Sequence, residues 1–260
     1  MEFRDIRGLS GLTITPYRIV GGRPGTHAGL PSPTVTLVID LGTGLTLSTD
    51  DDAPRTFRAA LGGMHLRPVA IHHDGTQVGV QLDLAPAAVR TLFGLPPGEL
   101  FGRNLALADL APGLAGRLYD DLGAAEPDTR AARCAALLTA VPRYRAPADD
   151  DAARIWQFLA RRRGRVTVAE LVDRSGWSAR KLSALFAAEY GMGLKQAARL
   201  FRFDHARRRL ETGTPIAEVA ADCGYADQAH LTREVHDFTG LPPAAFLAAR
   251  TAEFAGATRS

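Results

Sequence analysis

The sequence has little of what disulfide frameworks and membrane spans need. It holds only two cysteines among 260 residues, Cys134 and Cys223, and both lie in helical patterns, which predicts buried, reduced thiols. No apolar stretch approaches the roughly 18 residues of a membrane span, and the N-terminus lacks the apolar core of a signal peptide. With 46% hydrophobic and 23% charged residues, we expect a cytoplasmic globular protein that has no membrane partner.

Catalytic and metal-binding patterns are missing as well. The sequence has no Gly-x-Ser-x-Gly, no glycine-rich phosphate loop and no Cys–His pairing of note. His27, His65, His72 and His73 invite the idea of a metal site, but no two of them are separated by one residue. His72 and His73 are adjacent, so on a strand their side chains would face opposite sides. We therefore predict no metal, no cofactor and no enzymatic activity.

Lysine is scarce and positive charge is unevenly spread. Lys181 and Lys195 are the only lysines, and the net charge is only +3. Residues 1–150 carry 14 basic and 16 acidic side chains, whereas residues 151–260 carry 17 basic and 12 acidic ones. The C-terminal part, at about +5, is therefore the part expected to bind a polyanion.

The first ninety residues have the pattern of β-strands. Residues 34–41, 44–49, 66–72 and 76–84 are β-branched or alternating runs, and Pro68 would lie at an edge or a bulge. The last two runs flank Asp74 and Gly75, a pair that predicts a hairpin because both turn positions need positive φ. Several short strands with Gly/Pro turns favour a small barrel or sandwich.

Helical periodicity begins at residue 86. We expect a helix over 86–93 that ends at Gly94, and two more over 105–122 and 127–141. The last has an apolar stripe, which we interpret as core, with a dimer seam as the alternative; it comprises Ala131, Cys134, Ala135, Leu138 and Val141.

A polar, proline-bearing segment separates the halves. We place a linker at 142–150, and Asp149 to Asp151 would lie in the first turn of the next helix. That helix, over 152–162, ends in the basic run 161–165, which is either a solvated helix end or a phosphate contact.

Two stretches of the C-terminal third are similar to each other. Residues 168–186 and 216–235 each show a short apolar helix, a turn with Gly176 or Gly224 beside an aromatic, and a second helix. This is the helix-turn-helix pattern, in which the second helix enters the DNA major groove. A helix over 194–210, about 25 Å long at 1.5 Å per residue, would hold the two units apart. Arg207 to Arg209 would contact phosphate or simply coat this helix.

In each unit the apolar stripe leaves some side chains free for DNA. In the first unit Ser178 caps the second helix while Leu182 and Phe186 pack it down. The exposed candidates for DNA binding there are Ser178, Arg180, Lys181, Ser183 and Ala184. In the second unit Leu231 and Val235 pack inward, and His230 is interpreted as a helix-surface or packing residue rather than a ligand. The candidates there are Gln228, Ala229, Thr232 and Arg233. Glutamine can pair with adenine and arginine with guanine or phosphate, so the second unit has the better base-contacting chemistry.

Residues 151–250 resemble the DNA-binding domain of the AraC/XylS transcription regulators. The resemblance rests on residues 182–186, 190–192, Arg202, Ala206, 216–220, 224–225, Gln228, 231–233, 238–243 and Phe246. It implies base contacts at Arg180, Ser183 and Ala184 in the first unit and at Gln228, Ala229, Thr232 and Arg233 in the second. Ala197, Val235 and Leu247 depart from the residues usual in the family.

The resemblance also implies an organisation and partners. We expect an α+β chain: a cupin-like β-barrel or sandwich with helices over 1–141 for sensing and dimerisation, the linker 142–150, the all-α DNA-binding domain 151–250 and a tail 251–260. The implied function is a sequence-specific transcription regulator that responds to a small-molecule effector. The alternative is a DNA-binding regulator whose N-terminal domain only dimerises or binds proteins. The implied partners are double-stranded promoter DNA, an effector of unknown identity, a second copy of the chain and, as a further candidate, RNA polymerase.

Overall fold

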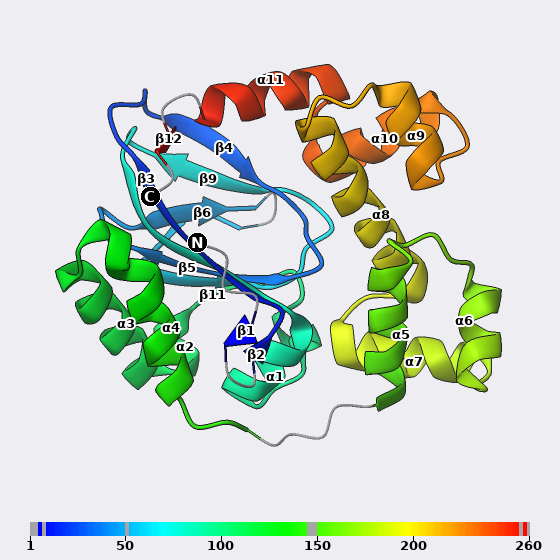
Figure 1. Cartoon of the computed structure of the whole chain (residues 1–260), viewed down its shortest axis with the longest axis horizontal. Coiled ribbons are helices and arrows are strands. Elements are labelled where there is room, and N and C mark those ends of the chain that lie inside the picture. The colour runs from blue at the N-terminus through cyan, green and yellow to red at the C-terminus, as the bar shows by residue number, and fades with distance from the viewer. Residues whose placement is uncertain (1–4, 7–8, 50–51, 145–149, 255–256, 259–260) are drawn as a thin grey trace.

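The computed structural model describes residues 5–6, 9–49, 52–144, 150–254 and 257–258 of the chain. Figure 1 shows an N-terminal half of strands with helices against them, and a C-terminal half that is all helical. The expected α+β order is thereby confirmed. Of the expected linker 142–150, residues 145–149 lie outside the described residues, as do 255–256 and 259–260 of the expected tail.

The strands form two main antiparallel sheets and a small pair. One sheet has the order β11-β8-β5-β10-β3-β12 and the other β4-β9-β6-β7, while β1 pairs with β2. The strands are β1 (Asp5–Ile6), β2 (Leu9–Ser10), β3 (Leu12–Ile19), β4 (Gly25–Gly29), β5 (Val35–Asp40), β6 (Leu45–Ser48), β7 (Arg55–Phe57), β8 (Ala59–Gly62), β9 (Val69–His73), β10 (Gln77–Leu84), β11 (Asn104–Ala106) and β12 (Ala257–Thr258).

The six-stranded sheet lies between the four-stranded sheet and a layer of helices. Its β5 alternates sides, so Leu37 faces the main core while Val38 packs on the cluster shared with the four-stranded sheet. That shared cluster contains Leu45 and Phe57 from one sheet and Ala60 from the other. The N-terminal half is therefore a sandwich, as the strand pattern predicts; its likeness to a cupin stays a prediction.

The predicted hairpin around Asp74 and Gly75 is wrong. Both strands form, and Gly75 has the positive φ of 98° that the turn requires. However, β9 pairs with β4 and β6, whereas β10 pairs with β3 and β5. Because each strand has both edges occupied by other partners, the two cannot pair with each other. The turn passes from one sheet to the other, and the Gly75 carbonyl accepts from the Gly22 amide at 3.0 Å.

Eleven α-helices and two short 3-10 turns are seen in the described part of the chain. They are α1 (Pro86–Phe93), η1 (Pro97–Leu100), α2 (Leu107–Leu110), α3 (Pro112–Ala124), η2 (Pro127–Thr129), α4 (Arg130–Ala140), α5 (Asp150–Arg161), α6 (Val168–Ser175), α7 (Ala179–Tyr190), α8 (Leu194–Glu211), α9 (Ile216–Cys223), α10 (Gln228–Thr239) and α11 (Pro243–Phe254). None that lies within the described ranges is both long and apolar enough to cross a membrane.

The helix over 86–93 is confirmed, with Gly94 in the left-handed conformation at its end. The single helix expected over 105–122 is wrong. Residues 104–106 pair with β8, and Ala111, at φ −145° and ψ 70°, separates α2 from α3. The reason is Pro112, which disfavours helical backbone in the residue before it.

The apolar stripe of α4 lies in the chain's own core. Ala131, Cys134 and Leu138 are at most 4% exposed and belong to the main hydrophobic cluster. The core interpretation is therefore confirmed for these three side chains, while Ala135 and Val141 are half-buried against the same cluster. The same cluster continues without a break into the helices of the C-terminal half.

Candidate nucleic-acid interface

The first helix-turn-helix unit is formed by α6 and α7. Thr167 and Glu170 make reciprocal capping bonds at the start of α6, and Gly176, at φ 70°, ends it. Ser178 then caps α7, because its hydroxyl accepts from the Lys181 amide at 3.3 Å. Residues next to the turn therefore determine where α6 ends and where α7 begins.

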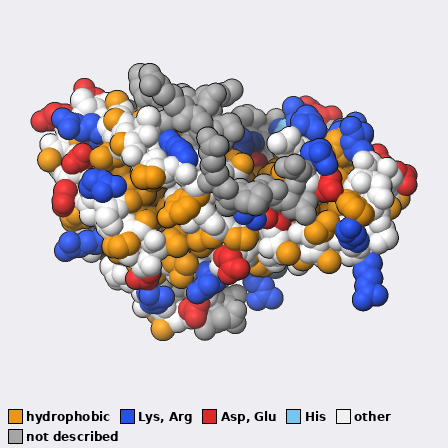
Figure 2. All heavy atoms as spheres, turned by 90° about the horizontal axis from the view of Figure 1, so that it is seen from below, with side chains coloured by type: hydrophobic (Ala, Val, Ile, Leu, Met, Phe, Trp, Pro, Cys, Tyr) orange, Lys and Arg blue, Asp and Glu red, His pale blue; other side chains and the backbone are white. Residues whose placement is uncertain are grey.

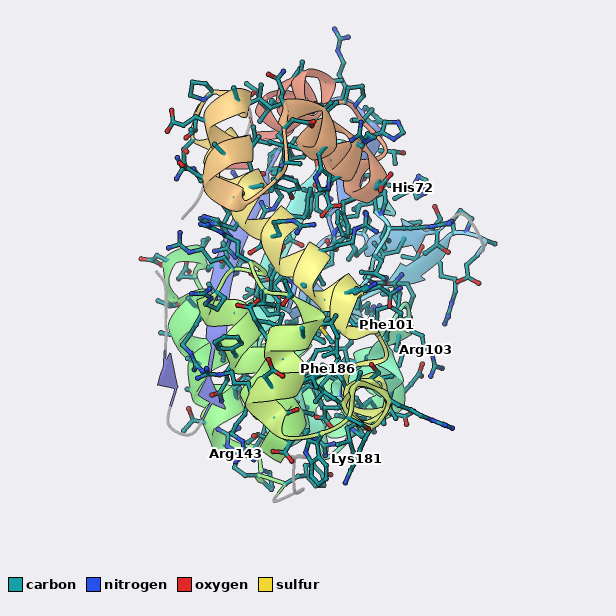
Figure 3. All side chains as sticks on the ribbon, turned by 90° about the vertical axis from the view of Figure 1, so that its right-hand side faces the viewer. His72, Phe101, Arg103, Arg143, Lys181 and Phe186 are labelled. Carbon is teal, nitrogen blue, oxygen red and sulfur yellow. The ribbon has the colours of Figure 1, made fainter. Side chains whose placement is uncertain are left out.

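The side chains predicted to bind DNA in this unit all face solvent. Leu182 and Phe186 are fully buried and hold α7 against the body. The exposed set is Ser178, Arg180, Lys181, Ser183 and Ala184. Figure 3 shows Lys181 at the edge of the molecule and Phe186 within it.

An aromatic platform beneath Lys181 was not predicted. The ammonium nitrogen lies 3.1 Å from the centroid of the Trp177 ring, and the Trp177 indole donates to Asp151 Oδ2 at 2.7 Å. This indole bond, followed by the bond from the Arg154 guanidinium, lowers the pKa of Asp151. The platform holds a cation beside the first turn of α7, where a phosphate would approach the helix N-terminus.

The second unit, α9 and α10, repeats this geometry. Gly224 ends α9 at φ 77°, and Asp227 caps α10 by accepting from the His230 amide at 2.6 Å. The cap was missed, although an aspartate just before an apolar-periodic segment is a recognised start signal. Pro215 is the N-cap of α9 and not its first helical residue.

Most of the second predicted set is also exposed. Gln228, Ala229 and Arg233 face solvent, whereas Thr232 is half-buried. His230 packs edge-on against the Tyr225 ring, with centroids 5.2 Å apart, as the packing interpretation predicts.

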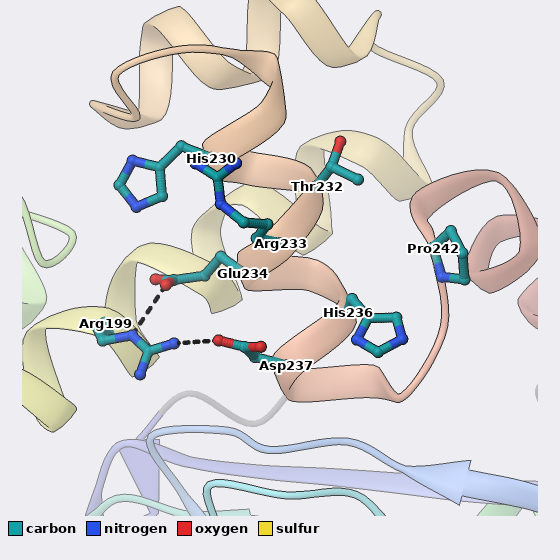
Figure 4. Close-up of a pocket in the computed structure, with 8 residues that line it drawn as sticks. All are labelled: Arg199, His230, Thr232, Arg233, Glu234, His236, Asp237 and Pro242. Atoms are coloured by element: carbon teal, nitrogen blue, oxygen red, sulfur yellow. Dashed lines mark hydrogen bonds and ion pairs between the residues drawn. The ribbon is translucent and has the colours of Figure 1, made fainter.

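Ion pairs fix α10 to the spacer helix α8. Arg199 donates to Glu234 at 2.9 Å and to Asp237 at 2.8 Å (Figure 4). Arg202 donates to the same Glu234 at 3.1 Å. Arg199, Glu234 and Asp237 line a surface groove of about 590 Å³ beside Thr232 and Arg233. The groove therefore lies along the contact between α8 and α10.

The arginines near the end of α8 coat that helix. Arg207 pairs with Asp204 and Glu211, Arg208 with Asp204, and Arg209 with Glu218 and Asp222. Because each of these three arginines is paired with a carboxylate, the structure favours a role in coating α8 over a role in phosphate contact.

The basic run 161–165 forms a tight turn. Arg163 and Gly164 have φ of 53° and 71°, and the Arg163 guanidinium donates to His205 at 3.0 Å. Arg165 donates to the Asp222 carbonyl at 3.2 Å, which links the start of the first unit to the end of α9. Arg161 and Arg162 are exposed. Figure 2 shows Lys and Arg side chains projecting from the C-terminal half of the molecule, in line with its positive charge.

A cavity of about 830 Å³ lies where the four-stranded sheet meets α10 and α11. Its walls combine apolar side chains with arginines and histidines from both halves of the chain. The apolar ones include Ile19, Leu30, Val69, Leu241 and Phe246, and the basic ones are Arg23, Arg250, His27 and His73.

The histidines of this region have other partners than a metal ion. His27 and His73 have ring centroids 5.2 Å apart, while His72 bonds to Thr26 at 3.0 Å and to Ser48 at 2.7 Å. Burial, the neighbouring His73 and Arg250 lower the pKa of His27 to about 4, so its ring is neutral near pH 7. In the described part of the chain no three His, Cys, Asp or Glu side chains cluster as metal ligands would.

Comparison with known proteins agrees with this geometry. Residues 171–249 match the family of helix-turn-helix domains, and no curated protein matches the chain. ToxT from Vibrio cholerae is 10% identical in sequence, with a TM-score of 0.56 over 92% of this chain and 98% of that chain. A second ToxT structure, with an unsaturated fatty acid bound, is 13% identical, with a TM-score of 0.51 over 91% of this chain and 94% of that chain. The DNA-binding domain of AdpA, solved with a target DNA, is 28% identical, with a TM-score of 0.37 over 40% of this chain and 95% of that chain.

The fold and the matched residues define a DNA-binding protein of the helix-turn-helix class. The expected resemblance of the C-terminal domain to the AraC/XylS regulators is confirmed, and residues 171–249 form a helix-turn-helix domain.

Proposed function

We propose that this chain is a DNA-binding transcription regulator and that it responds to an amphipathic carboxylic acid held in the cavity between the four-stranded sheet and α10–α11. The cavity carries the proposal, because it places guanidinium groups beside an apolar wall. A guanidinium is the side chain best suited to a carboxylate, and the apolar wall would bury a hydrocarbon body. Two ToxT structures of similar fold hold such compounds, an unsaturated fatty acid and (E)-4-(8-methylnaphthalen-1-yl)but-3-enoic acid.

We also propose roles for the exposed side chains of α7 and α10. Arg180, Ser183, Ala184, Gln228, Ala229, Thr232 and Arg233 would contact base edges, while Ser178 and Lys181 would hold the backbone phosphates near the start of α7. Their position on the second helix of each unit supports these roles, as does the exposure of all of them but the half-buried Thr232. Dimerisation and contact with RNA polymerase stay predictions.

A thermal-shift titration of the full chain with oleic acid and its methyl ester tests the effector. A ligand that binds only the folded form raises the melting temperature as it saturates the site. We expect oleic acid to raise it and the ester, which lacks the charge, to raise it much less. The Arg23→Ala variant should lose most of the difference. Equal shifts with both compounds, or none, would favour an N-terminal half that only dimerises or binds proteins.

A further inference from the structure

The connection between α5 and α6, residues 161–165, carries four exposed arginines and is named the arginine turn below. They are Arg161, Arg162, Arg163 and Arg165. In the part of the chain that the structure describes, none of the four forms an ion pair with a carboxylate, whereas Arg207 to Arg209 of α8 all do. The arginine turn is therefore a patch of positive charge that the protein itself does not neutralise.

The backbone of the arginine turn is held in a conformation that arginine disfavours. Arg163 has φ 53°, the only positive φ at a residue other than glycine among the described residues. The Arg163 amide donates to the Ala160 carbonyl at 3.0 Å, and the Gly164 amide donates to the Leu159 carbonyl at 2.9 Å. Glycine is usual at the left-handed position of this helix-ending motif. Backbone strain of this kind clusters at functional sites, so an arginine here points to a function of its side chain.

The arginine turn lies between the two helix-turn-helix units. A Cβ on Gly164 would lie 2.7 Å from the Arg202 amide nitrogen, so the turn is pressed against α8. Arg165 donates to the Asp222 carbonyl at 3.2 Å, and a Cβ on Gly224 would lie 3.3 Å from Arg165 Cγ. Figure 1 shows the connection from α5 to α6 beside α8, between the first unit and α9. The turn therefore sits next to the segment that leads into α10.

Both of the proposed DNA-contacting helices, α7 and α10, begin on the side away from the strands. Arg90 Nε of α1 donates to Glu189 at 2.7 Å, and these side chains, 14% and 7% exposed, hold the last turn of α7 against the N-terminal half. Thr239 and Leu241, at the end of α10, line the cavity shared with the sheets. Figure 1 shows α6 and α9, which precede the two helices, farthest from the strands. A duplex that contacts the first turns of both helices would therefore also face the arginine turn.

We propose that the arginine turn is a third DNA-contacting element, in which Arg163 and Arg165 bind backbone phosphates. These phosphates border the groove entered by α10, on the side that faces the first unit. Each guanidinium has five N–H donors, so the single bonds to His205 and to the Asp222 carbonyl leave donors for a phosphate. Phosphates are the same in every sequence, so the turn adds affinity without sequence preference. This inference rests on the proposed DNA binding and adds to it a site between the two units.

The salt dependence of DNA binding tests the contacts. Arg163→Gly and Arg165→Gln should each lower the slope of the logarithm of the binding constant against that of salt concentration by about 0.9, which is roughly eightfold in affinity at about 0.1 M salt. The loss should be equal for a duplex that the chain selects from a random library and for a scrambled duplex of the same length. Arg208→Gln removes the same charge from a carboxylate-paired arginine and is the matched control. Slopes equal to that of the control would overturn the proposal, as would a loss confined to the selected duplex.

Neutral methylphosphonates in the selected duplex locate the contact. Placed at the border of the α10 groove, they should weaken binding of the unmodified chain and leave a variant with both Arg163→Gly and Arg165→Gln unaffected. Equal weakening of both proteins would overturn the placement.

Thermal unfolding separates contact from structure. Arg163→Gly should raise the melting temperature, because glycine relieves the strained backbone, while it weakens DNA binding. A lower melting temperature would overturn the role of Arg163. A chain that selects no duplex would overturn the proposed DNA binding and this inference with it. A selected duplex whose binding Arg233→Ala weakens, with unchanged salt slopes in the turn variants, would overturn the arginine turn alone.

Discussion

Glu234 of α10 lies 4% exposed between two arginines of α8, with Arg199 Nε at 2.9 Å. Arg202, which is 19% exposed, donates to the other carboxylate oxygen. The orientation of α10 on α8 therefore depends on one buried carboxylate.

Replacing that carboxylate should destabilise the protein. Glu234→Ala leaves the partly buried Arg202 without its ion pair, and we expect a loss of about 2–4 kcal/mol in the free energy of unfolding. Asp237→Ala removes the 59% exposed partner of the same Arg199 and should cost no more than about 0.5 kcal/mol. Urea unfolding of both variants checks this; equal losses would mean that Glu234 is not the structural member of the pair.

The turn at Gly164 gives a second stability prediction. A Cβ there would lie 2.1 Å from the Ala198 carbonyl oxygen, and φ is 71°. We expect Gly164→Ala to cost about 2–4 kcal/mol, since both the backbone and α8 would have to shift. Gly116→Ala in the exposed face of α3 meets nothing within 4 Å and should stabilise by about 0.5–1 kcal/mol. Thermal unfolding of the two variants compares them directly.

The C-terminal half could be predicted well because its signals are local. Gly176 and Gly224 end the first helix of each unit at positive φ, and Ser178 caps α7, each within a few residues of the chain. Apolar periodicity then separated the buried Leu182 and Leu231 from their exposed neighbours.

The rest depends on partners that are far apart in the sequence. Nothing near Asp74 and Gly75 indicates that β9 and β10 belong to different sheets, because their partners are strands from elsewhere in the chain. Likewise Arg90 and Glu189 are 99 residues apart, and neither position has a pattern that marks an ion pair. The cavity was missed for the same reason, since its walls come from both halves.

The stability should depend on pH through His65. Burial lowers the pKa of His65 to about 4, against the opposite effect of its bond to Asn104. In the unfolded chain the pKa is about 6.5, so between these values the unfolded state binds more protons and folding weakens as the pH falls. Below about pH 4 both states are protonated and the contribution levels off.

A variant isolates this contribution. Between pH 7 and pH 4, protonation linked to His65 should lower the free energy of unfolding by at most about 3 kcal/mol, and His65→Asn should remove this decrease. Urea unfolding of the variant and of the unmodified chain at each pH measures the difference. His236→Asn, at an exposed position of α10, is the control. Parallel pH curves for all three proteins would contradict the assignment.

DNA affinity should be largely electrostatic and should depend on α10. Arg233 is exposed on that helix, so Arg233→Ala should weaken binding to a duplex selected by the chain from a random library by about 1–3 kcal/mol. The logarithm of the binding constant should fall linearly with the logarithm of salt concentration, with a slope of several units. Gel-shift titrations give both quantities. A binding constant that does not change with salt concentration would contradict the electrostatic account. An unchanged affinity of the Arg233→Ala variant would show that Arg233 does not contact the DNA.

Hydroxyl-radical footprinting of that selected duplex tests most directly whether the two units bind one DNA molecule together. We expect two protected segments about one helical turn, roughly 34 Å, apart on one face of the duplex. Arg180→Ala should weaken protection of one segment and Arg233→Ala protection of the other, because the two residues lie on α7 and α10. A single protected segment, or the same segment weakened by both variants, would contradict the account.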